Sequence, residues 1–180
     1  SARVRFGVRE LLLRSPVAAD YDVEGTAALG PSTIRGIALT KASFEGAYRE
    51  GATTIRRVDV AGPALEAGGT GVVAPCPANP AAICPTDFSY DIARADLERL
   101  RPFVSSIVTG VLATKGRLTG SLDRPHVVGD ATVTRLVAPE FEALTMSAHY
   151  DITAPSLQFE SAVGRAEVRA SLLKVFGRSM

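Results

Sequence analysis

The sequence predicts a mainly β protein: an elongated, curved antiparallel sheet, closed incompletely as a barrel or sandwich, with one short amphipathic helix. Three observations support this fold class. Apolar and polar residues alternate with period two along most of the chain, which is typical of strands with one buried face. Clusters of glycine and proline separate the alternating runs, as turns do. A single segment, residues 92–104, has apolar residues at helical spacing.

The first predicted hairpin pairs residues 4–13 with residues 17–29, and Ser15 and Pro16 form its turn. In the second strand, aliphatic residues, glycine and one tyrosine share one face, while acidic residues and threonine take the other. We therefore expect a long, half-buried strand here.

Further strands follow from the same alternation. They are predicted over residues 37–42, 44–48, 55–61, 65–73, 144–152, 157–163 and 166–172. Arg49-Glu50-Gly51 and Gly62-Pro63 supply turns between the earlier ones. With the segment 108–136, the alternation gives about ten to twelve strands.

Residues 108–136 repeat one pattern and form the most regular part of the chain. Glycines and aliphatic residues lie on one side of an alternating strand, Pro125 is placed in the turn, and the next strand contains another glycine. This pattern predicts a long meander in which glycines allow the sheet to bend.

The predicted helix covers residues 92–104. Leu97, Leu100 and Val104 lie on one helical face, and Asp91 is available as the N-terminal cap. We expect this apolar stripe to cover one end or edge of the sheet.

Residues 75–87 form a loop rich in proline, which prevents regular strand pairing. Cys76 and Cys84 lie in this loop and are the two cysteines of the chain. A disulfide between them, worth about 2–3 kcal/mol in the chain-entropy model, is favoured over free thiols and implies an oxidising compartment. A zinc site is disfavoured, because His126 and His149 are isolated in the sequence.

Composition and charge exclude several classes. Hydrophobic residues make up 46% of the chain and charged residues 22%, which excludes a disordered chain. The net charge of +1 is too small to predict a nucleic-acid partner. No apolar run is long enough to span a bilayer.

Motifs for catalysis are also missing. Ser121 is not in a G-x-S-x-G nucleophile elbow, and the glycines of residues 68–71 lack a P-loop lysine and a following helix. The acidic residues Asp20, Asp22 and Glu24 alternate along one solvent face. We expect no enzyme activity, no cofactor and no metal.

The apolar face must be buried against something. The two faces of an ordinary sandwich or barrel could meet with nothing bound, or an incompletely closed sheet could take acyl chains, whose burial is favourable by about 0.8 kcal/mol per methylene. The residues that would line such a groove are Val17, Ala19, Tyr21, Val23, Ala27, Leu29, Val108, Leu112, Leu118, Leu122, Leu144, Met146 and Tyr150.

The segment GRLTGSLDRPHVVGDATV, from Gly116 to Val133, resembles a recurrent turn of the AsmA-like and TamB superfamily of bacterial envelope proteins. The preceding Phe88-Ser-Tyr-Asp-Ile and Ala95-Asp-Leu-Glu-Arg-Leu add to the resemblance, as does the unit from residue 37 to residue 73. Compared with that superfamily, the chain lacks an N-terminal membrane helix and adds the loop at residues 75–87.

This resemblance implies a β-taco, an open sheet with an apolar interior, in a periplasmic protein tethered to the inner membrane. We therefore expect residues 1–180 to be a single module from a longer, membrane-anchored protein. Its groove would carry phospholipid or another acyl lipid between the inner and outer membranes. The alternative is a β scaffold that serves outer-membrane protein assembly with a barrel partner, or binds proteins, without transporting lipid.

Overall fold

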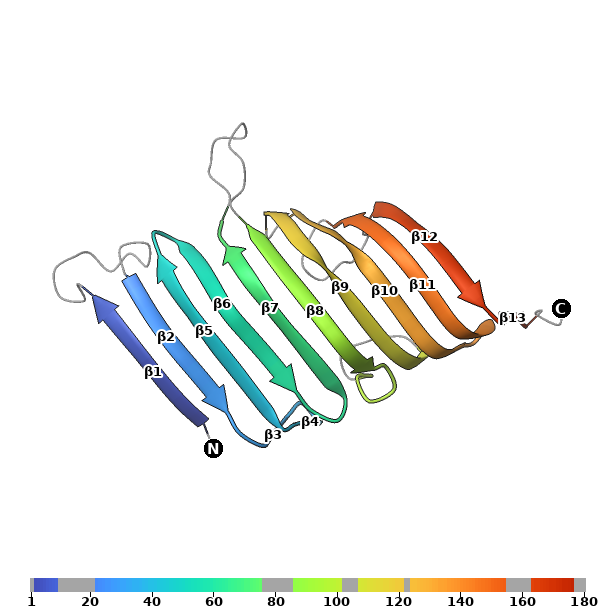
Figure 1. Ribbon diagram of the computed structural model, residues 1–180, viewed down its shortest axis with the longest axis horizontal. Helices are drawn as coiled ribbons and strands as arrows, with labels where there is room; N and C mark the ends of the chain where they lie inside the picture. The colour runs from blue at the N-terminus through green and yellow to red at the C-terminus, as the bar shows by residue number, and fades with distance from the viewer. Residues whose placement is uncertain are drawn as a thin grey trace.

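The structure, a computed structural model, describes residues 2–9, 22–75, 86–101, 107–121, 124–154 and 163–176. Within these ranges the chain consists of strands joined by turns and loops and contains no helix. The described part therefore holds no helix that is long and apolar enough to cross a membrane. One antiparallel sheet of eleven strands makes up most of the structure. A separate two-stranded hairpin lies at one end of its strands (Figure 1).

The sheet follows the chain almost without crossovers, in the order β1-β2-β5-β6-β7-β8-β9-β10-β11-β12. Its strands are β1 (Ala2–Arg9), β2 (Asp22–Leu29), β5 (Lys41–Arg49), β6 (Ala52–Ala61), β7 (Leu65–Val73), β8 (Asp87–Asp96), β9 (Thr109–Ser121), β10 (Arg124–Ala138), β11 (Phe141–Thr153) and β12 (Val163–Ser171). The short β13 (Lys174–Val175) pairs with β11, and β3 (Ser32–Ile34) pairs with β4 (Ile37–Leu39).

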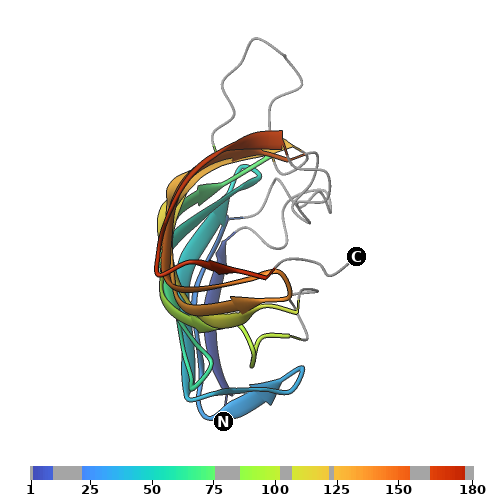
Figure 2. The same cartoon turned by 90° about the vertical axis from the view of Figure 1, so that its right-hand side faces the viewer.

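The strands arch along their length, so that the sheet is C-shaped when it is viewed along its long axis (Figure 2). We call the concave side of this arch the trough; it crosses the strands from β1 to β12. The hairpin β3–β4 projects from one end of the strands toward the concave side. The predicted fold class, an elongated and curved antiparallel sheet that is not closed into a barrel, is thus confirmed.

The compact core of the described residues is small and lies beside this hairpin. Ile37 of β4 packs in one cluster with Ala64, with Ala95 of β8 and with Leu100. Because the hairpin lies on the concave side, the face of β8 that carries Ala95 is the concave face. Further along this face, apolar side chains stay accessible: Phe6 is 72% exposed and Val168 is 54% exposed.

Two tight hairpin turns have residues with positive φ, and the sequence predicts the first of them. Glu50 and Gly51 both have positive φ, 48° and 81°, which is the backbone of a type I′ turn. The turn predicted at Arg49-Glu50-Gly51 is therefore confirmed. Arg35 and Gly36, with φ of 47° and 83°, form a similar turn between β3 and β4.

The predicted helix is wrong over its described part. Residues 92–96 continue β8, because Ile92 pairs with Ala67 on one side and with Thr114 on the other. One turn follows, in which the Leu100 amide donates to the Asp96 carbonyl at 3.0 Å. Residues 102–106, which include Val104, lie outside the described residues. Leu100 is nevertheless buried against one end of the sheet.

One predicted turn and one predicted strand also need correction. Pro125 is not in a turn but is the second residue of β10, where it pairs with Gly120 and is fully buried. A proline is tolerated there because it lies at the start of the strand. The strand predicted over residues 37–42 is divided, since 37–39 form β4 and β5 begins at Lys41.

Several predicted features lie outside the described residues: the turn at Ser15 and Pro16, residues 17–21, residues 157–162, and Cys76 and Cys84 with most of their loop. The base of that loop is described. The buried Thr86 hydroxyl accepts a hydrogen bond from the Ala74 amide at 3.1 Å and donates one to the Ala74 carbonyl at 2.8 Å. This double contact joins the ends of β7 and β8 below the loop.

Candidate functional site

The strand registers arrange the concave face as three rows of residues that run along the trough, one residue from each of the ten strands from β1 to β12. The central row is Val4, Ala27, Phe44, Val58, Gly69, Tyr90, Gly116, Gly129, Tyr150 and Ala166. On one side of it lie Phe6, Gly25, Gly46, Ile55, Gly71, Phe88, Leu118, Val127, Ile152 and Gly164. On the other side lie Ala2, Leu29, Ala42, Val60, Ala67, Ile92, Thr114, Ala131, Ala148 and Val168.

We call these three rows the floor of the trough. The floor contains no charged residue, and its only side-chain polar atoms are the hydroxyls of Tyr90, Tyr150 and Thr114. Small residues occupy many of the other positions. The floor is therefore a continuous apolar strip that crosses every strand of the main path.

Aromatic rings lie across glycines on this floor. A Cβ added at Gly116 would lie 2.6 Å from the Tyr90 hydroxyl, and one at Gly129 would lie 2.6 Å from the Tyr150 hydroxyl. At Gly69 a Cβ would meet the ring of Phe88 at 2.3 Å. Only glycine leaves room for these rings, which cover backbone that glycine would otherwise expose.

The three floor hydroxyls meet at one point between β8 and β11. The Tyr90 and Tyr150 oxygens are 2.5 Å apart, and the Tyr150 oxygen is 2.7 Å from the Thr114 hydroxyl. Thr114 in turn donates to the Asp130 carbonyl at 2.9 Å. Burial, and then the hydrogen bond with Tyr150, raises the pKa of Tyr90.

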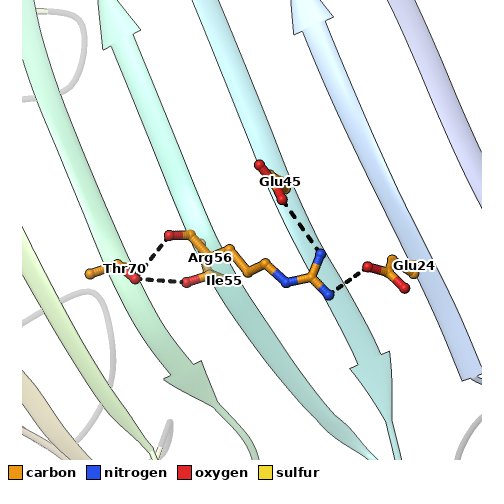
Figure 3. Close-up of polar contacts among 5 residues, drawn as sticks. All are labelled: Glu24, Glu45, Ile55, Arg56 and Thr70. Atoms are coloured by element: carbon orange, nitrogen blue, oxygen red, sulfur yellow. Dashed lines mark hydrogen bonds and ion pairs between the residues drawn. The ribbon is translucent and has the colours of Figure 1, made fainter.

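The opposite face of the sheet is polar and is bridged by ion pairs. Arg56 reaches across β5 and contacts Glu24 at 2.5 Å and Glu45 at 3.5 Å (Figure 3). A bulge between Ile55 and Val58 places Arg56 here, and the Thr70 hydroxyl donates to the carbonyls of residues 55 and 56, at 3.1 and 3.0 Å. The bulge thus gives one arginine two carboxylate partners.

Similar pairs continue toward β11. Arg117 forms a two-pronged contact with Asp87, and its hydrogen bonds lower the pKa of that carboxyl. His126 contacts Asp151 at 2.7 Å, and the remaining pairs in this region are Arg57 with Asp59 and His149 with Asp130. The histidines that look isolated in the sequence each have a carboxylate partner. Among the described residues, no group of three or more potential ligands could hold a metal ion.

Hollows occur on both faces. A hollow of about 1000 Å³ lies over the polar face and is lined by residues such as Arg57, Lys115 and His126. On the floor, hollows of about 220 and 330 Å³ lie where β1, β2 and β5 meet. We favour the floor as the functional surface, because in the larger hollow most charged groups already have partners.

The predicted groove residues fall into three groups. Those on the concave face are Val23, Ala27, Leu29, Leu112, Leu118, Met146 and Tyr150. Leu144 of β11 is 53% exposed, and Val108 lies just before β9. Val17, Ala19, Tyr21 and Leu122 lie outside the described residues.

Sequence reasoning missed four aromatic members of the floor, namely Phe6, Phe44, Phe88 and Tyr90. Each of them lies on the same face of the sheet as glycines of a neighbouring strand. This alternation of aromatic residues and glycines on one face could have predicted them. No protein-family model, curated protein or solved structure matches this chain, so the site is defined by its geometry alone.

Proposed function

We propose that this chain is a lipid-carrying segment of a cell-envelope protein. Its floor would hold the acyl chains of phospholipid, or of another acyl lipid, and carry them between the inner and outer membranes. One observation carries the proposal: an uncharged apolar strip crosses ten strands of an open sheet, and among the described residues only the β3–β4 hairpin packs on this face, near Ile92. The same function is what the resemblance to AsmA-like and TamB proteins implies.

Burial energy supports an acyl ligand. Each methylene placed on an apolar surface contributes about 0.8 kcal/mol, so a tail along the floor would gain several kcal/mol. The floor also offers accessible side chains for that contact, including Val4 at 64% and Phe44 at 37% exposure.

The direction of the trough supports passage rather than storage. The rows run across the strands, so a chain lying in the trough would cross strand after strand without meeting a charged group. The polar face, by contrast, carries ion pairs that are exposed to solvent. We place the protein in the periplasm, tethered to the inner membrane in its full-length form, where a Cys76–Cys84 disulfide would persist.

Neighbouring alanines of β2 allow a matched test. Ala27 is in the central row, whereas Ala28 is on the polar face opposite Arg3. Lipid that copurifies with the protein should be lost in Ala27→Glu and retained in Ala28→Glu, as measured by native mass spectrometry. Absence of acyl lipid from the wild-type protein, or its equal retention in both variants, would contradict the proposal.

A second candidate function is a scaffold for protein partners, such as an outer-membrane barrel protein. All nine residues of β12 are exposed, and β12 ends the main strand path. An open strand edge of this kind can accept an extended segment of another protein. Crosslinking from Glu167 to a barrel protein, abolished by Arg169→Pro on the polar face of β12 while lipid is still bound, would favour this function.

A further inference from the structure

The three hydroxyls of the floor have only one arrangement of protons in which every contact is a hydrogen bond. The Asp130 carbonyl can only accept, so the Thr114 hydroxyl proton is committed to it. Thr114 must then accept from Tyr150 at 2.7 Å. The Tyr150 proton is thereby committed as well, and Tyr90 must donate to Tyr150 at 2.5 Å.

In this series of hydrogen bonds Tyr90 is the first donor, followed by Tyr150 and then Thr114. The Tyr90 oxygen gives its proton to Tyr150 and receives none from a described residue, so its lone pairs remain available. Tyr90 is half-buried in the central row, and its hydroxyl lies above Gly116. Of the three floor hydroxyls, Tyr90 is the one that accepts no hydrogen bond from a described residue, so its oxygen has the most capacity to accept one from a ligand.

We infer that Tyr90 is a hydrogen-bond acceptor site in the trough, which selects acyl ligands that carry a hydroxyl or amide donor over ligands that carry only acceptors. This inference rests on the proposed function, since it assumes that an acyl chain lies on the floor. One neutral hydrogen bond changes affinity by about fivefold. The expected selectivity is therefore modest but measurable.

A pair of probes isolates the donor. Lauryl alcohol and lauryl methyl ether share the same chain, but only the alcohol can donate a hydrogen bond. Each would compete with a fluorescent fatty acid bound to the purified chain. The alcohol should compete about fivefold more strongly with the wild-type protein, and this preference should disappear in Tyr90→Phe, which keeps the ring above Gly116.

Two further variants control the result. Tyr48 is on the same concave face, opposite Val23, and makes no hydrogen bond among the described residues, so Tyr48→Phe should retain the preference. Thr114→Val removes the acceptor of the Tyr150 proton and frees a donor in the Tyr pair. The ether should then gain affinity relative to the wild-type protein.

The outcomes separate the two proposals. If the fluorescent fatty acid does not bind, the proposed function fails and the inference fails with it. If it binds but the wild-type protein does not distinguish alcohol from ether, or the preference survives in Tyr90→Phe, the inference alone is overturned.

Discussion

The two faces of the same strands differ in how their side chains find partners. On the polar face, Arg56 contacts two carboxylates and Arg117 contacts Asp87, so the charges are matched within the sheet. On the concave face, apolar side chains such as Phe6 and Val168 remain exposed. The charges of the polar face are thus paired within the sheet, whereas the concave face leaves large apolar side chains accessible.

The largest effect should come from filling the space under an aromatic ring. Gly129→Val would push a side chain into the Tyr150 hydroxyl and the Lys115 carbonyl, which lie 2.6 and 2.5 Å from an added Cβ. We expect a loss of about 2–3 kcal/mol in the free energy of unfolding, measured by urea denaturation. Gly7→Val is the control, since nothing lies within 4 Å of a Cβ there. Equal stability of the two variants would argue against the packed floor.

Removing the middle of the hydroxyl chain should have the next largest effect. Tyr150→Phe leaves the Tyr90 proton without its acceptor and Thr114 without its donor. We expect about 1 kcal/mol of destabilisation by the same measurement. Tyr90→Phe should cost less, because Tyr150 keeps its bond to Thr114. A larger loss of stability in Tyr90→Phe than in Tyr150→Phe would contradict the assigned order of donors, from Tyr90 through Tyr150 to Thr114.

High pH should weaken the floor through Tyr90, whose pKa is raised by burial. Tyrosines of the unfolded chain ionise near pH 10, at about their ordinary pKa, while folded Tyr90 keeps its proton. The contribution of Tyr90 to the free energy of unfolding is fully present below that pH. The free energy of unfolding then falls as the pH rises above it, because the unfolded chain loses this proton first. Tyr90→Phe should make this fall shallower than in the wild-type protein, as followed by unfolding at several alkaline pH values.

The smallest effect is expected on the polar face. Arg56→Gln removes the contacts with Glu24 and Glu45, but these side chains are about half exposed to water. Exposed ion pairs contribute little, and salt screens them. The melting temperature should fall slightly at low salt and match the wild-type value at high salt. A large fall in melting temperature that persists in high salt would mean that the ion pairs of the polar face contribute substantially to stability.

Period-two alternation was enough to predict the fold class, because each strand has one apolar face and one wet face. It failed at residues 92–96, where a helix is predicted because Leu97, Leu100 and Val104 have helical spacing. The pairing of Ile92 with Ala67 and Thr114 makes this segment part of a strand.

The floor itself could be predicted only in part. Val23, Ala27 and Leu118 follow from alternation within their own strands. The contact between Tyr90 and Tyr150, in contrast, joins residues 60 positions apart and depends on the registers of three successive strand pairs. The pairs of His126 with Asp151 and of His149 with Asp130 were missed for the same reason.

The most direct test of the account uses two neighbouring residues of β10. Ala131 is on the floor, opposite Thr114 and Ala148, and Thr132 is on the polar face. A photoreactive side chain placed at residue 131 should crosslink to acyl lipid in cells, and the same group at residue 132 should not, as detected by mass spectrometry of the purified protein. Lipid adducts at both positions, or at neither, would contradict the claim that the concave face carries lipid.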